Sequence, residues 1–370
     1  MGKLSSFGQH LYEGKVSFDF VGRRKLWYTI SMLIVVFAVG GFVQRGFNMG
    51  IEFKGGVEFT AKVQKADGAT VDRMTNAVVD AGVPEAGDPQ VTTSGSDSLR
   101  IQTRALSQDQ ASKIEAQLSK AGAHEVSQNL IGPTWGKQVA TKALTGLLVF
   151  VVLVVLFIWA YFREWRMSAA AIVALAHDLI ITVGVYAWSG FEITPATVTG
   201  LLTILGYSLY DTVVVFDKVR ENTRGFLRAT NRTYSESANL AINQTLVRSI
   251  NTSITALLPV GALLIVGVTV LGTGPLKDLA LALFVGMAAG TYSSIFIATP
   301  LAAQLKESEA AVKAQAQRVF ARRNKESGKA SGTTAVKVKT ETVRPVTASG
   351  SAKRNQPKRA PRSKRGKGSK

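Results

Sequence analysis

The sequence predicts an α-helical polytopic membrane protein with six spans and one small α+β domain inserted after the first span. Six segments contain the roughly 17–25 apolar residues that a helix needs to cross a hydrocarbon core about 30 Å thick. Only 19% of the residues are charged, whereas 46% are hydrophobic, a balance typical of membrane proteins. One long polar segment, residues 46–135, has the periodicity of strands and helices and predicts the inserted domain.

The first predicted span, residues 26–43, follows an N-terminal segment, residues 1–25, that ends in three basic residues. Such a flank is typical of a signal peptide, but no small-residue cleavage site follows Val43. We therefore interpret this span as a retained anchor. Residues 139–305 contain the other five. The six predicted spans are Leu26–Val43, Val139–Phe162, Met167–Trp188, Pro195–Phe216, Leu246–Leu271 and Leu279–Leu305.

The short loops predict the orientation, because cytoplasmic loops carry an excess of Lys and Arg. The loops Ser189–Thr194 and Gly272–Asp278 contain one such residue, Lys277. The opposite side is basic throughout; it holds Arg23, Arg24, Lys25, Arg163, Arg166, Lys218, Arg220, Arg224, Arg228 and Arg232. We therefore expect a multi-pass protein of the plasma (inner) membrane with both termini in the cytoplasm and residues 46–135 outside.

The extracytoplasmic segment reads as strand, helix, two strands, helix and strand. Val57–Val63 alternates like a strand, and Thr70–Ala81 has helical spacing. Short strands are expected at residues 90–93 and 99–104, a helix capped by Ser107 up to about residue 121, and a last strand at residues 125–130. This order is that of a ferredoxin-like sandwich.

The C-terminal segment, residues 306–370, carries most of the net charge of the chain. It holds 19 Lys or Arg and 4 Asp or Glu, and thus +15 of the total of +19. Beyond about Lys325 its composition cannot bury enough surface to offset the entropy of ordering. We expect a basic, largely disordered cytoplasmic tail. A solvated arm is the simpler interpretation, and binding to anionic lipid or RNA is the alternative.

Composition also restricts the chemistry. The chain has no cysteine and three histidines, so neither a thiolate nor a histidine-rich metal centre is expected. The segment Gly132–Lys137 has three residues between its glycines, where a phosphate-binding loop has four. The spans contain no Ser/His pair, HExxH or GxGD motif of an intramembrane protease. We therefore predict no cofactor, no metal and no enzymatic activity.

Ionisable residues inside the spans point to function, because each costs about 2.5–3.5 kcal/mol to insert. Asp178, beside His177, is the deepest; Asp211 lies in the fourth span and Arg248 at the start of the fifth. A buried carboxylate near a guanidinium can take up and release protons, which favours a proton relay. The alternative is that Arg248 extends to the headgroups and the acids are neutral packing groups.

The sixth span contains Gly286 and Gly290 at a spacing that lets helices approach closely. This pattern predicts helix packing in a compact bundle.

Several segments resemble the SecF family, one half of the SecDF accessory factor of the bacterial Sec translocon. The resemblance covers about residues 17–306. The matching segments are Phe18–Arg23 (FDFVGR), Gly50–Gly56 (GIEFKGG), Gly132-Pro133, Gly136-Lys137, His177-Asp178, Gly206–Asn222 (GYSLYDTVVVFDKVREN) and Gln244–Arg248 (QTLVR). Glu52 stands where that family usually has Asp, and the tail is longer than usual.

The resemblance implies half of a resistance-nodulation-division-type bundle that pairs with SecD. It further implies use of the proton motive force to promote translocation of unfolded preproteins, together with a SecYEG-type translocon. By position, Asp211 and Arg248 fall on the proton-relay residues of the family, and His177 and Asp178 become secondary candidates. The alternative is a half-size proton-coupled exporter of lipids or small molecules. Such exporters usually carry twelve spans, so either function requires a partner half.

Overall fold

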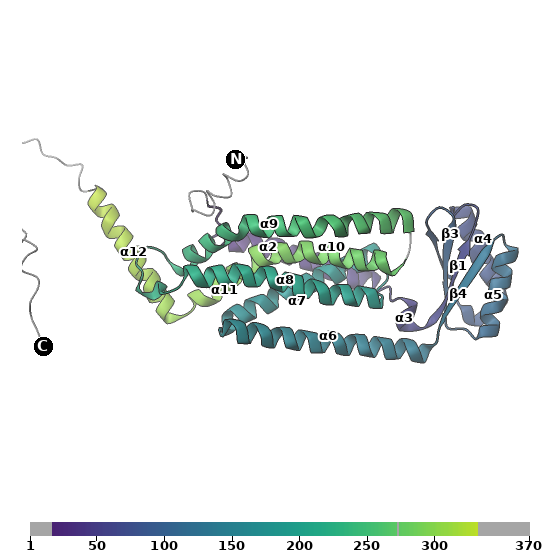
Figure 1. The fold of residues 1–370 in the computed structure, drawn as a ribbon. Coiled ribbons are helices and arrows are strands. Elements are labelled where there is room, and N and C mark those ends of the chain that lie inside the picture. The colour runs from purple at the N-terminus through teal and green to yellow at the C-terminus, as the bar shows by residue number, and fades with distance from the viewer. Residues whose placement is uncertain (1–16, 272–273, 332–370) are drawn as a thin grey trace, which may run out of the picture. The chain divides into compact units, whose positions relative to one another are not determined.

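The computed structural model of the chain describes residues 17–271 and 274–331 (Figure 1). Six of its helices are long and apolar enough to cross a membrane. The fold class predicted from the sequence is therefore confirmed. The first five spanning helices are α2 (Arg24–Arg45), α6 (Pro133–Phe162), α7 (Trp165–Ser189), α8 (Pro195–Asn222) and α9 (Tyr234–Val266), the last followed by a π turn, η3 (Gly267–Leu271).

The sixth span differs from a simple helix. It begins as α10 (Pro275–Ser293), widens into a π turn, η4 (Ser294–Ala298), and continues as α11 (Thr299–Glu307). The helices α8 and α9 also extend beyond the predicted apolar spans, to Asn222 and back to Tyr234. Capping boxes at Thr194 and Thr233 satisfy the first backbone N–H groups of α8 and α9 and fix where these helices begin.

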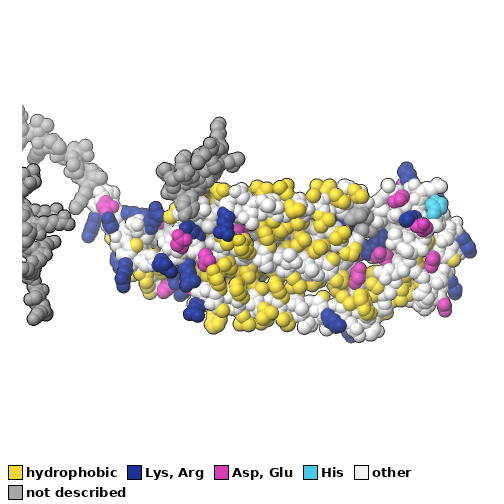
Figure 2. Space-filling view, in the orientation of Figure 1, with side chains coloured by type: hydrophobic (Ala, Val, Ile, Leu, Met, Phe, Trp, Pro, Cys, Tyr) yellow, Lys and Arg dark blue, Asp and Glu magenta, His cyan; other side chains and the backbone are white. Residues whose placement is uncertain are grey.

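Three helices form the interior of the bundle. About half or more of the apolar window is buried in α7, α8 and the α10–α11 span, at 50%, 50% and 61%. In α6 and α9 the buried shares are 6% and 11%. Hydrophobic side chains cover the outside of the helices, and charged side chains gather beyond both ends of this band (Figure 2). The outer helices therefore present apolar surface to lipid or to a partner.

The inserted domain has the predicted order of strands and helices. Its strands are β1 (Gly56–Lys62), β2 (Gln90–Ser94), β3 (Ser98–Thr103) and β4 (Glu125–Ile131). They form an antiparallel sheet in the order β2-β3-β1-β4, as in a ferredoxin-like fold. The helices α4 (Gly68–Asp80) and α5 (Gln108–Lys120) cover one face, packing on Val57, Phe59, Leu99 and Ile101.

A short segment joins the first span to this domain. The helix α3 (Ile51–Lys54) is followed by Gly55, whose φ of 78° favours glycine. A side chain on Gly55 would collide with Pro133 at the start of α6, and one on Gly136 would collide with the backbone of Phe53. The glycines therefore let the entry to the domain pack against the start of the second span.

The chain continues after the sixth span as one more helix, α12 (Ala310–Ser331). Val312 and Val319 are buried, and the Gln315 amide donates to the backbone oxygens of Ala229 and Arg232, at 3.0 and 2.8 Å. This side chain fixes the loop between α8 and α9. The helix continues past Lys325, where disorder was expected to begin; the remaining residues of the predicted tail, 332–370, lie outside the described residues.

Candidate functional site

Asp178 lies in the interior of the bundle, where it accepts hydrogen bonds from two serines and lies beside His177. Its side chain is 1% exposed. One carboxylate oxygen faces His177 Nδ1 at 3.2 Å, and the other accepts from Ser208 Oγ at 2.6 Å and Ser293 Oγ at 2.8 Å. The serines come from α8 and α10. Buried polar groups require such partners, so the residue types around Asp178 explain how a carboxylate is accommodated inside the bundle.

Asp211, one helix further along the chain, is also bound by two serine hydroxyls. It is buried in α8 and accepts from Ser249 Oγ of α9 at 2.7 Å. Its second oxygen accepts a short hydrogen bond from Ser294 Oγ at the first residue of η4. Each acid is thus held by a serine of the next helix along the chain and by one of two consecutive serines, Ser293 and Ser294.

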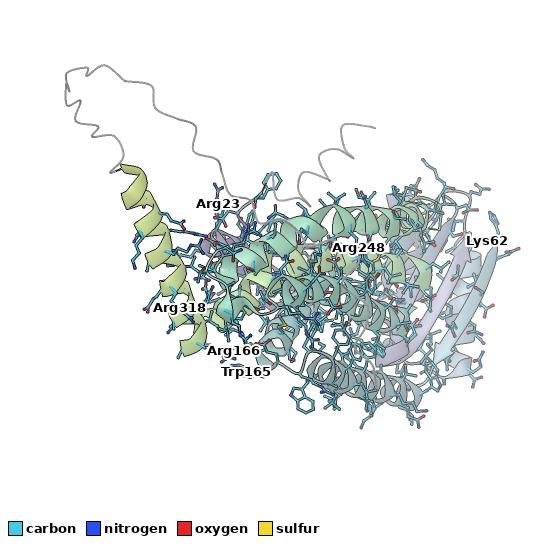
Figure 3. All side chains as sticks on the ribbon, turned by 60° about the vertical axis from the view of Figure 1, so that its left-hand side comes forward. Arg23, Lys62, Trp165, Arg166, Arg248 and Arg318 are labelled. Carbon is cyan, nitrogen blue, oxygen red and sulfur yellow. The ribbon has the colours of Figure 1, made fainter. Side chains whose placement is uncertain are left out.

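Arg248 lies outside the group of serines that hold Asp178 and Asp211. It comes from α9 (Figure 3), is exposed, and donates to the hydroxyl of Tyr210 at 3.0 Å; Tyr210 is 54% exposed. Although both residues are described, Asp211 and Arg248 form no ion pair with each other. They occupy adjacent helices, and the neighbour of Arg248, Ser249, contacts Asp211 directly. Their joint action remains a prediction.

His177 has one ring nitrogen without a partner. Its Nε2 is buried and makes no hydrogen bond in the described structure, while the ring stacks on Tyr292 at 6.0 Å between centroids. Tyr292 in turn shares a hydrogen bond of 2.9 Å with Ser31 of α2. His177 and Asp178 remain secondary candidates for the proton relay.

The two glycines of α10 lie where this helix crosses α8. A side chain on Gly286 would overlap Ile204, and one on Gly290 would stand 2.8 Å from the Cβ of Ser208. The absence of these side chains brings α10 close enough to α8 for Ser293 and Ser208 to reach the same oxygen of Asp178.

Sequence reasoning missed the four serines that hold the acids. Ser293 and Ser294 were recognisable only as small residues suited to helix packing. Which acid each serine hydroxyl reaches depends on how the helix is rotated. The π turn that directs Ser294 towards Asp211 has no clear sequence signal. Ser208 lies three residues before Asp211, on the adjoining turn of α8, and that spacing was the available hint.

A second group of charges lies at the outer end of the bundle. Arg100 of β3 pairs with Glu58 of β1 at 2.5 Å and with Glu192, in the loop between α7 and α8, at 3.1 Å. The backbone N–H of Gly50 donates to the oxygen of Ile193 in the same loop, at 2.9 Å. These contacts connect the inserted domain with the bundle.

Glu52 is part of this outer group but has no cation of its own. One of its carboxylate oxygens is buried and makes no hydrogen bond in the described structure. Burial raises the pKa of the Glu52 carboxyl, the attraction of Arg100 opposes this, and the nearby Glu192 and Glu58 reinforce it. Among the described residues, no group of three or more His, Asp or Glu is arranged to hold a metal ion.

Comparison with known proteins places these features in one family. Residues 111–308 match the family "Protein export membrane protein SecD/SecF, C-terminal", and residues 40–67 match the "SecD/SecF GG Motif". The second match contains Gly55 and Gly56. A "Protein translocase subunit SecF" of Streptomyces coelicolor is 52% identical over 326 residues, covering 87% of this chain and 86% of that one. One from Rhodothermus marinus is 36% identical, covering 80% and 95%.

The fold agrees with a solved structure of the same family. The crystal structure of SecDF, a translocon-associated membrane protein from Thermus thermophilus, matches with a TM-score of 0.69 and 32% identity. The match covers 79% of this chain and 39% of that chain, so the present chain corresponds to part of SecDF. From its sequence matches and its bundle with one inserted sheet domain, we conclude that the chain belongs to the SecF family.

Proposed function

We propose that this chain is an accessory subunit of the Sec protein translocase. Paired with SecD, it uses the proton motive force to promote preprotein translocation across the plasma membrane. The observation that carries the proposal is Asp211, a carboxylate buried in α8 of a SecF-family bundle, which two serine hydroxyls hold within the described part of the chain. Intramembrane acids of this kind are typical of proton pathways.

The chemistry needs no covalent step. An ionised carboxylate only accepts hydrogen bonds, whereas a protonated one also donates. When Asp211 takes up a proton, its new O–H group needs an acceptor, and one of the two serines can supply it by turning its own proton to another acceptor. Since the serines belong to α9 and to the α10–η4 junction, the change is felt by three helices. The inserted domain, joined to the bundle by α2, α6 and the Arg100 contacts, moves with them and acts on the emerging polypeptide.

A partner half is supported by the outer surface of the bundle. Arg248 and Tyr210 form an exposed polar pair on apolar helices, where lipid offers no partner of comparable polarity. The named relative that contains SecD and SecF together is much longer than this chain. We assign this face to SecD, with Arg248 completing the proton path there. His177 and Asp178 are the secondary candidates for the proton relay.

The same proposal includes orientation and other partners. Both termini lie in the cytoplasm, as the Lys and Arg of the loops favour, and a SecYEG-type translocon and unfolded preproteins are the partners. The basic tail adds attraction to anionic lipid, worth about 1 kcal/mol for each Lys or Arg near the surface. Loss of salt-sensitive binding to acidic liposomes after truncation at Lys325 tests that part. A half-size exporter of lipids or small molecules is not favoured, since the relatives described above are translocase subunits.

The proposal is tested with sealed membrane vesicles that contain the translocon and SecD, with or without this chain. Export of a preprotein is measured with ATP supplied, and an ionophore collapses the proton gradient in half of the samples. We expect a gradient-dependent gain in export only when the chain is present. An equal gain without the chain would contradict the proposal.

A further inference from the structure

The two intramembrane acids are connected by one short backbone segment. Ser293 donates to Asp178 and the next residue, Ser294, donates to Asp211. The hydrogen bonds around the two acids also share the helix α8. This helix carries Asp211, and it carries Ser208, which donates to Asp178. Serine–carboxylate hydrogen bonds therefore connect the helices α7, α8, α9 and α10.

Each of the two consecutive serines has a second acceptor within reach. The Ser293 hydroxyl also lies 3.3 Å from the backbone oxygen of Gly290, and that of Ser294 lies 3.1 Å from the oxygen of Thr291. A serine hydroxyl has a single proton to donate. When a carboxyl becomes protonated, its serine can therefore turn to the helix backbone without leaving a buried donor unsatisfied.

The backbone that carries the serines changes its helical form between them. Ser293 ends α10, and Ser294 begins the π turn η4. The oxygen of Ser294 accepts from the hydroxyl of Thr299 at 3.1 Å, which compensates part of the wider turn. Single π turns inside helices frequently occur at functional sites, where the local geometry is easier to change than in a regular helix.

We propose that Ser293 and Ser294 are positioning residues that join Asp178 and Asp211 into one proton-responsive unit. A serine that turns its proton from its acid to the backbone changes the hydrogen bonding of the α10–η4 junction, and the neighbouring serine on that junction holds the other acid. The two acids then titrate as a coupled pair, with apparent midpoints that belong to the pair. The inference rests on the proposed function, because the proton uptake of Asp211 is what it extends.

The charged and titratable surroundings support coupling through hydroxyls. His177 faces Asp178, Tyr292 stacks on His177, and Tyr210 and Arg248 lie beside the Asp211 site on the outer surface. Within the described residues, neither acid has a lysine or arginine in ion-pair contact. Both carboxylates are therefore bound by serine hydroxyls, and Asp178 has His177 as an additional neighbour.

The test uses the full chain with its SecD half in vesicles and measures gradient-dependent export as a function of pH. Ser293→Ala removes a donor from Asp178 only, and Ser294→Ala removes one from Asp211 only. Ser168→Ala is the matched control, since Ser168 is also buried but donates to the backbone oxygen of Glu164 at 3.1 Å. Recovery of each variant with SecD and its thermal unfolding establish that it is folded.

We expect Ser293→Ala and Ser294→Ala each to displace the midpoint of the pH profile by about half a unit or more, about threefold in proton concentration. The double variant should displace it by an amount that differs from the sum, because the serines act on one unit. The control should keep the wild-type midpoint. An unchanged midpoint in Ser293→Ala, or strictly additive displacements, would overturn the coupling.

Failure of the proposed function has a different signature. In that case Asp211→Asn retains the full gradient-dependent gain, whatever the serine variants do. A double-mutant cycle of Asp178→Asn and Asp211→Asn in thermal unfolding gives a second measurement that needs no export. Additive effects there would also contradict the coupling, because sites without shared partners add.

Discussion

At the residue scale, Glu52 of α3 lies near Arg100, Glu58 and Glu192, and burial raises the pKa of its carboxyl. One of its carboxylate oxygens is buried and has no donor among the described residues, and the Arg100 guanidinium that attracts the carboxylate is already bound to Glu58 and Glu192. The charged form of Glu52 is therefore desolvated without full compensation. The fold therefore favours the protonated form of Glu52 more than water does.

This difference gives a pH dependence with a definite sign. Burial raises the pKa of Glu52 in the folded chain, so its unfavourable contribution is absent at low pH and grows as pH rises through the folded-state pKa. Glu52→Gln should raise the thermal unfolding midpoint in detergent at pH 8 and change it little at pH 4. The exposed Glu85→Gln provides the control. A variant that is less stable than wild type at pH 8 would rule out this account.

At the scale of residues, the sequence identified the buried acids but not the serines that donate hydrogen bonds to them. Asp178, Asp211 and Arg248 stood out because ionisable residues are rare in apolar spans. Which hydroxyl reaches which oxygen depends on helix rotation and on close crossing of α8 and α10, and these follow from tertiary packing. Arg248 shows the limit most clearly, because its position beside Asp211 in the bundle did not produce a direct ion pair.

At the scale of elements, the helix α10 owes its place to its glycines. A side chain on Gly290 would press on Ser208, so α10 could not lie as close to α8 as it does. The predicted order of the inserted domain followed from two periodicities, of strands and of amphipathic helices, that its core requires. The π turns and the extensions of α8 to Asn222 and of α9 back to Tyr234 arise from polar caps and packing, which hydropathy does not detect.

The glycine contact gives a prediction for this helix. Gly290→Ala should lower the thermal unfolding midpoint in detergent, since overpacking typically costs about 1–3 kcal/mol, and should also weaken gradient-dependent export. Gly146→Ala is the control, as a side chain there meets no neighbour and alanine favours a helix. Equal midpoints for Gly290→Ala and wild type would show that the crossing tolerates a methyl group.

At the scale of the whole molecule, the bundle leaves much of its apolar surface uncovered. Its interior helices bury about half of their apolar windows, whereas α6 and α9 remain largely uncovered. Polar residues such as Arg248 on that surface need a partner. In the proposed orientation, the inserted domain faces the outside, where preproteins emerge, and α12 faces the cytoplasm.

The natural absence of cysteine makes this orientation simple to measure. Single cysteines replace exposed residues of the two sides, Ser119→Cys in α5 and Ala314→Cys in α12. In intact cells an impermeant maleimide should label the first and not the second, and both should react after the membrane is opened. Labelling of Ala314→Cys alone in intact cells would invert the topology.

The central claim, that proton uptake by Asp211 drives the accessory function, is tested most directly with one substitution. Asp211→Asn removes the titration and keeps the shape, so the protein should insert and bind SecD. The exposed Asp217→Asn on the same helix is the matched control. In sealed vesicles supplied with ATP, we expect Asp217→Asn to keep the gradient-dependent gain in preprotein export. Asp211→Asn should lose that gain and keep the ATP-driven part. Full gradient-dependent stimulation in Asp211→Asn would contradict the claim.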